Sequence, residues 1–144
     1  MKHALRRLMV IVVAAGLAAA IAGCRDSGHD VPHLESMAEF NEKVVDADRP
    51  VLVDFYMDGC PPCRRLAPVI ADLHADYAGR ADVYKIYNRT ARGIFQHFEV
   101  RSVPTIVLFN AGEPVDDWTG VPGGDADRAD TILRKALDDA LAGG

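Results

Sequence analysis

The chain has 144 residues, which is enough for one compact domain and too short for two ordinary ones. Hydrophobic residues make up 49% of it and charged residues 26%, a balance typical of a globular protein rather than a disordered or fibrous one. Three cysteines are too few for a small domain built on disulfides. A net charge of −5 without a basic patch argues against nucleic acid as a partner.

The first 23 residues have the pattern of an export signal. Basic residues come first, an apolar stretch over 8–20 follows, and small residues then lead to Cys24. The apolar stretch is shorter than the roughly 20 residues that a membrane-spanning helix needs. Residues 21–24, Ile-Ala-Gly-Cys, resemble the bacterial lipoprotein signal, in which the cysteine is diacylated and becomes the mature N-terminus. There are two alternatives: an ordinary signal peptide with an incidental cysteine, and a retained signal anchor.

Residues 24–33 are expected to form a polar tether, and residues 34–144 the folded domain. Without residues 1–23 the chain keeps 13 basic and 21 acidic residues, so the mature protein is acidic and adsorbs poorly to anionic lipid. Lipid on Cys24 would then supply the attachment to a cell-envelope membrane. In enterobacteria an aspartate directly after such a cysteine retains the protein in the inner membrane. Arg25 stands there instead, which favours the outer membrane.

The pattern after the tether predicts alternating helices and strands. Ser36 and Glu39 fit a capping box that opens the first helix. Apolar periodicity and turn residues then predict, in chain order, a helix over 36–47, a strand over 50–57, a helix through 67–77, a strand over 83–87, a helix over 90–98, a strand over 104–109, a strand from the turn at 111–114 through Trp118, and a final helix capped by Asp125.

These elements predict an α/β fold with a mixed central sheet and helices on both faces. Strands joined through helices imply parallel pairing by right-handed crossovers. The last two strands are joined by a tight turn and are therefore expected to be antiparallel.

Two cysteines stand where the first long strand meets a helix. Cys60 and Cys63 are separated by Pro61 and Pro62, and residues three apart lie on one face of a helix, so their sulfurs can bond. Cys60 is expected at the helix start, where free backbone N–H groups and the helix dipole stabilise a thiolate and lower the pKa of the thiol. Cys63, one turn further on, is expected to be the more buried and less reactive thiol.

These positions define a thiol–disulfide exchange reaction. Cys60 would attack a substrate disulfide, and Cys63 would then resolve the mixed disulfide and close the Cys60–Cys63 bond. The candidate base for Cys63 is Asp54, which lies in an otherwise apolar strand, so that burial would raise the pKa of its carboxyl. Lys85 is a candidate for lowering it again, and a merely structural role for either residue stays open.

The chain resembles the thioredoxin family over about residues 34–141. The resemblance is carried by Val53-Asp54-Phe55-Tyr56, Cys60-Pro61-Pro62-Cys63, Leu66-Ala67-Pro68, Val103-Pro104-Thr105, Val107-Leu108-Phe109 and Gly120. It implies the thioredoxin fold, a cis peptide bond before Pro104 beside the cysteines, and backbone groups of Val103 that bind an extended substrate strand. Asp54 and Lys85 match the family's buried acid and its lysine partner. It implies a monomer that acts on protein disulfides without a cofactor.

The chain departs from this family at the rim of the site. Gly59 replaces the tryptophan before the first cysteine, and Pro61 replaces the glycine between the cysteines. Gly59, Pro61 and Pro62 are therefore expected to contact substrate on a surface with less apolar cover than the family's usual one.

The sequence leads to the hypothesis of an envelope thiol–disulfide oxidoreductase that chiefly reduces protein disulfides. In an oxidising compartment, a reductase needs an electron supply. By analogy, this donor would be a membrane protein that carries the electrons of cytosolic thioredoxin outward. Without that donor the same pair would act as an oxidant. A non-catalytic binding module or chaperone stays open as well, as does a purely structural disulfide. No metal is expected, because a zinc site needs four ligands and the chain has no second cysteine pair.

Overall fold

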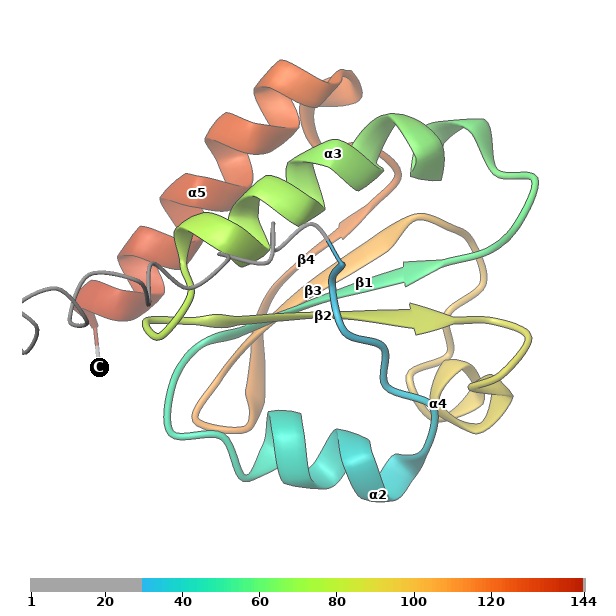
Figure 1. Ribbon diagram of the computed structural model, residues 1–144, viewed down its shortest axis with the longest axis horizontal. Helices are drawn as coiled ribbons and strands as arrows, with labels where there is room; N and C mark the ends of the chain where they lie inside the picture. The colour runs from blue at the N-terminus through green and yellow to red at the C-terminus, as the bar shows by residue number, and fades with distance from the viewer. Residues whose placement is uncertain (1–29, 144) are drawn as a thin grey trace, which may run out of the picture.

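The computed structural model describes residues 30–143 (Figure 1). The predicted signal segment and the predicted lipidation site at Cys24 lie outside these residues. The elements in chain order are α2 (Met37–Phe40), a π-helical turn η1 (Asn41–Val45), β1 (Val51–Tyr56), α3 (Pro61–Asp76), β2 (Asp82–Tyr87), α4 (Arg92–His97), β3 (Thr105–Asn110), β4 (Glu113–Thr119), a 3-10 turn η2 (Pro122–Gly124) and α5 (Ala126–Ala142).

The four strands form one mixed sheet in the order β2-β1-β3-β4. β1 pairs in parallel with β2, and the register places Asp54 opposite Lys85. β1 and β3 are antiparallel, as are β3 and β4, which are joined by the tight turn that the sequence predicted. β1 is therefore a central strand, which agrees with its nearly continuous apolar sequence.

The prediction of parallel pairing across every helical connection is wrong for β3. α4 has six residues and is about 9 Å long, whereas a six-residue strand spans about 20 Å, so α4 cannot return the chain along the sheet. β3 consequently starts beside the end of β1, where Thr105 pairs with Phe55. This reversal brings the segment before β3 to the end of β1 that leads into α3.

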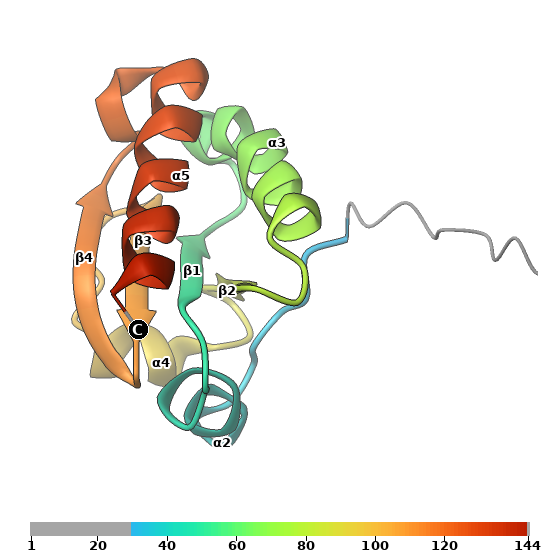
Figure 2. The same cartoon turned by 90° about the vertical axis from the view of Figure 1, so that its left-hand side faces the viewer.

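Helices cover both faces of the sheet, as the sequence predicted. Leu52 and Ile106 face α3 and α5, and pack with Leu66, Ile70 and Leu133 of those helices. Val53, Phe55 and Phe109 face the other way and pack against α2 and α4. Figures 1 and 2 show this division of the helices between the two faces. The alternation of side chains along β1 places Asp54 on the α3 face.

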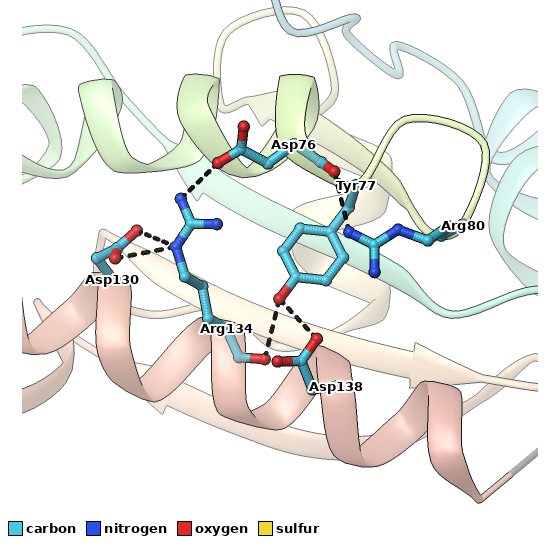
Figure 3. A network of polar contacts seen from close by, with 6 residues as sticks. All are labelled: Asp76, Tyr77, Arg80, Asp130, Arg134 and Asp138. Atoms are coloured by element: carbon cyan, nitrogen blue, oxygen red, sulfur yellow. Dashed lines mark hydrogen bonds and ion pairs between the residues drawn. The ribbon is translucent and has the colours of Figure 1, made fainter.

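A polar network joins the C-terminal part of α3 to α5 (Figure 3). Nη2 of Arg134 lies 2.8 Å from Oδ2 of Asp76, and its Nε lies 2.8 Å from Oδ1 of Asp130. The Tyr77 hydroxyl donates hydrogen bonds to Oδ1 of Asp138 at 2.8 Å and to the Arg134 carbonyl at 3.2 Å. These contacts fix the end of α3 that lies away from the cysteines.

The segment before α2 belongs to the folded domain. Val31 is buried in the core, and the backbone N–H of Lys85 donates to the Pro32 carbonyl at 2.9 Å. Leu34 in turn donates to the Lys85 carbonyl at 3.0 Å, so 32–34 extends the sheet beyond β2 (Figure 2). The domain therefore includes residues before the expected boundary at 34. Within residues 30–143, none of the helices has the length and apolar character needed to cross a membrane.

Candidate redox site

The two cysteines lie at the N-terminus of α3, where the sequence predicted them. Cys60 is the N-cap residue, and Pro61 and Pro62 occupy the first helical positions, in which a missing N–H costs no helical hydrogen bond. The backbone N–H of Cys63 donates to Sγ of Cys60 at 3.2 Å. The sulfurs are joined in a disulfide with an S–S distance of 2.13 Å. A helix N-terminus favours negative charge, so this position suits a Cys60 thiolate once the bond is reduced.

The two cysteines are almost equally buried, which corrects the expected difference between them. Cys60 is 8% exposed and Cys63 7%. Cys60 is covered because the loop before β3 folds over it, so that its Sγ lies 3.7 Å from the Val103 carbonyl oxygen. Sequence spacing along one helix could not show this cover, which comes from a segment some forty residues further along the chain.

The loop beside Cys60 contains the Val103–Pro104 peptide bond, which is cis, as the family resemblance implied. Two hydrogen bonds hold this loop. The Thr105 hydroxyl donates to the Ser102 carbonyl at 2.8 Å, and the Gly120 N–H donates to the Pro104 carbonyl at 2.8 Å. The loop is thus anchored to β3 and to the end of β4, in contact with the reactive disulfide.

Gly59 forms an open part of the rim. Its φ of +69° lies in the left-handed region that favours glycine, at the turn between β1 and Cys60. A Cβ placed on Gly59 would meet no atom within 4 Å, so the space beside the disulfide is open there. Pro61 is exposed next to it, and Pro62 is partly buried. The predicted loss of apolar cover at this position is therefore visible in the structure.

Asp54 lies behind the disulfide and is 2% exposed. Within the described residues, its Oδ1 has no hydrogen-bond partner. Burial disfavours the carboxylate and raises the pKa of Asp54 to about 7, against the opposing effect of the Lys85 charge. Asp54, Cys63 and Lys85 line one cavity of about 200 Å³, together with Tyr56 and Ala67. The arrangement provides a carboxyl near neutral pKa in a shared cavity with the second cysteine.

Lys85 contacts an aromatic ring instead of forming a close ion pair with Asp54. Its Nζ lies 4.2 Å from the centre of the Tyr56 ring, a cation–π contact. Tyr56 also stacks on Tyr87, and its hydroxyl lies 3.2 Å from Nε2 of His33. The sequence places His33 in the expected tether and gives the Tyr56 side chain no role at the site. The two-residue spacing of Asp54 and Tyr56 along one strand was the signal that both side chains share a face.

Asp58 contacts two residues at the end of β2 and just after it. The Tyr87 hydroxyl donates a hydrogen bond to its carboxylate, and Nη1 of Arg89 lies 3.5 Å from Oδ2. The hydrogen bond to Asp58 is the main cause of a raised pKa at Tyr87. The negative charge of Asp58 is thereby matched by an arginine near the rim of the site.

Comparison with known proteins agrees with this geometry. Residues 31–132 match the family model described as Thioredoxin. The match covers well over half of the chain, and the protein therefore belongs to the thioredoxin family.

Several relatives show the extent of the likeness. Thioredoxin M4, a chloroplastic protein of Arabidopsis thaliana, is 38% identical over 91 residues, which are 63% of this chain and 47% of the relative. A thioredoxin of Synechocystis sp. is 38% identical over 85 residues, or 59% of this chain and 79% of that one. The crystal structure of a Malassezia sympodialis thioredoxin matches with a TM-score of 0.65 at 25% identity, covering 78% of this chain and 91% of its own. The chain thus spans about half the length of the chloroplast relative.

Proposed function

We propose that the protein is a thiol–disulfide oxidoreductase that reduces disulfides of client proteins. The observation that carries the proposal is the Cys60–Cys63 disulfide at the N-terminus of α3, with the Val103–Pro104 loop beside Cys60. Asp54 lines a cavity with Cys63, and its Oδ1 has no hydrogen-bond partner within the described residues. The related proteins named thioredoxin support it.

The reaction starts from the reduced pair. The Cys60 thiolate attacks one sulfur of a client disulfide, forms a mixed disulfide and releases the other client sulfur as a thiolate, which takes up a proton. Cys63 loses its proton and attacks Sγ of Cys60, which releases the second client thiolate and closes the Cys60–Cys63 bond. Two electrons pass from the dithiol to the client. A further dithiol must return them before the next cycle.

Asp54 is the proposed proton acceptor for Cys63. A carboxyl whose pKa is near 7 can both take and return a proton at neutral pH. Cys63 and Asp54 border the same cavity, which gives room for a water molecule to carry the proton between them. Lys85 opposes the effect of burial and keeps that pKa from rising further.

The client is proposed to lie along the Val103–Pro104 loop. The Val103 carbonyl is next to Cys60, so an extended client segment that pairs with this backbone would present its disulfide to Sγ of Cys60. Gly59, Pro61 and Pro62 would form the opposite rim. The open space at Gly59 leaves room for bulky client side chains.

The protein is further proposed to work as a monomer tethered to a membrane of the bacterial cell envelope. The export signal and the lipoprotein-like residues 21–24 support this, with lipid on Cys24 and the outer membrane favoured by Arg25. Because the fold includes Val31, the proposed tether would comprise residues 24–30, which span at most about 25 Å when fully extended. The electron donor would be a membrane protein that relays thiol electrons outward.

A trapping experiment tests the proposed reaction. The variant Cys63→Ser lacks the resolving thiol, so clients should remain bound to Cys60 as mixed disulfides that a reducing agent releases. The matched control, Cys60→Ser, keeps Cys63 and should trap none. Recovery of no mixed disulfide with Cys63→Ser would contradict catalysis and favour a binding module or chaperone. Alkylation of thiols in cells tests the direction, since a fully oxidised pair would contradict the reductase and favour an oxidant.

A further inference from the structure

Five of the nine arginines in residues 30–143 lie in segments near the redox site. Arg64 and Arg65 directly follow Cys63. Arg89 follows β2, Arg92 is the first residue of α4, and Arg101 precedes Val103 by two residues. All five side chains are exposed. Figure 1 shows that the start of α3, the end of β2 and α4 lie at the same end of the sheet. This end is therefore basic, although the domain as a whole carries an excess of acidic residues.

Two of these arginines converge on one groove. A groove of about 540 Å³ is lined by Arg92 from α4, by Arg101 from the loop before β3, and by the amide side chains of Asn88 and Gln96. Glu99 also lines it and lies 3.5 Å from Nη2 of Arg101. Arg92 has no ion-pair partner within the part of the chain that the structure describes. The groove thus holds one uncompensated guanidinium beside several neutral donors.

The groove is next to the path proposed for the client. Its residue Arg101 belongs to the same loop as Val103, whose carbonyl lies 3.7 Å from Sγ of Cys60. Two residues of extended chain span about 7 Å. A client segment paired with this loop would therefore place one of its side chains in the groove. That side chain would lie two or three residues along the client from the attacked cysteine.

We propose that this groove, through Arg92 and Arg101, selects clients that carry an aspartate or glutamate two or three residues from the attacked cysteine. The proposal rests on the proposed disulfide reduction and names its preferred substrate class. Guanidinium groups bind carboxylates with paired N–H donors, and the amides of Asn88 and Gln96 add further donors. Gly59 removes apolar contact area at the opposite rim, so charge contributes a larger share of client binding.

The test compares two synthetic peptides, each closed by one disulfide, that differ only in having Glu or Gln two and three residues from one cysteine. We expect kcat/KM for the Glu peptide to exceed that for the Gln peptide about fivefold, the size that exposed ion pairs supply. The preference should shrink as salt is raised, because exposed charges are screened. Equal rates for the two peptides at low salt would overturn the proposal.

Variants identify the groove as the source of the preference. The double variant Arg92→Gln/Arg101→Gln should lower kcat/KM for the Glu peptide to the level of the Gln peptide and leave the latter unchanged. The matched control is Arg80→Gln, which removes an arginine beyond the far end of α3 and should keep the preference. A preference that survives in the double variant would overturn the proposal.

A neutral small disulfide, hydroxyethyl disulfide, separates this inference from the function on which it rests. The wild type and the double variant should reduce it at equal rates. If the wild type reduces neither this compound nor the peptides, the proposed reduction itself is wrong, and the substrate preference falls with it. Reduction of the neutral compound with equal peptide rates would overturn the preference alone.

Discussion

The carboxylates near the two ends of α3 lie in opposite environments. Near the C-terminus, Asp76 and Asp130 both pair with Arg134, and Asp138 accepts a hydrogen bond from Tyr77. Near the N-terminus, Asp54 is almost fully buried, and its Oδ1 has no hydrogen-bond partner within residues 30–143. The first arrangement stabilises the packing of α3 on α5 (Figure 3). The second costs stability and maintains a carboxyl that exchanges a proton near neutral pH.

The largest expected effect concerns stability. In the folded protein the pKa of Asp54 is about 7, against 3.8 for an ordinary aspartate. As pH rises between these two pKa values, Asp54 loses its proton in the unfolded chain before it does so in the folded protein. The free energy of unfolding therefore falls, by about 4 kcal/mol once Asp54 is ionised in both states. Asp54→Asn should therefore be more stable than the wild type by up to about 4 kcal/mol at pH 8, and by nothing below about pH 4. Urea unfolding at several pH values measures this. A gain that does not depend on pH would contradict the account of Asp54.

The same substitution should slow catalysis. Without a proton acceptor near Cys63, resolution of the mixed disulfide in Asp54→Asn should fall about 100-fold at neutral pH, the lower range for a lost general base. Attack by Cys60 on the client should change much less. Single-turnover kinetics separate the two steps, and an unchanged resolution rate would show that Asp54 is only structural.

At the other end of α3, Arg134→Gln should cost about 1–2 kcal/mol of stability, because two half-exposed ion pairs and their hydrogen bonds are lost. The rate of disulfide reduction at 25 °C should stay as in the wild type. Denaturant unfolding measures the loss of stability, and a reduction assay on the same preparation measures the rate. A large loss of activity in a folded Arg134→Gln protein would contradict the claim that the C-terminal end of α3 serves stability alone.

The smallest effect is expected from Lys85. Its charge lowers the pKa of Asp54, but Nζ contacts the Tyr56 ring and forms no close ion pair with the carboxyl. Lys85→Met should move the pH dependence of the resolution step to higher pH, with little change in the maximal rate. Lys43→Met, on the opposite face of the sheet, is the control and should leave the profile in place. A shift to lower pH would contradict the assigned role.

The sequence predicted the features that depend on neighbouring residues. Cys60 and Cys63 at a helix start, the capping box of Ser36 and Glu39, and the antiparallel turn before β4 follow from local spacing and turn chemistry. The cis bond at Pro104 came from the resemblance to the family. These predictions needed no knowledge of the path of the chain in space.

Features that depend on contacts between distant segments could not be predicted from the sequence. The cover on Cys60 comes from the loop before β3, which the antiparallel pairing of β3 with β1 brings beside the cysteine. The contact of His33 with Tyr56 exists only because the segment before α2 pairs with β2. The groove of Arg92 and Arg101 likewise joins two segments that no local pattern connects.

The central claim is that the N-terminus of α3 activates Cys60 as the attacking thiolate. The most direct measurement is the rate of alkylation of the reduced protein against pH, with the modified residue identified by mass spectrometry and an unfolded peptide covering residues 58–64 as the reference. We expect Cys60 to react first, with a midpoint well below that of the peptide. A midpoint equal to that of the peptide, with Cys60 and Cys63 modified at similar rates, would contradict the account.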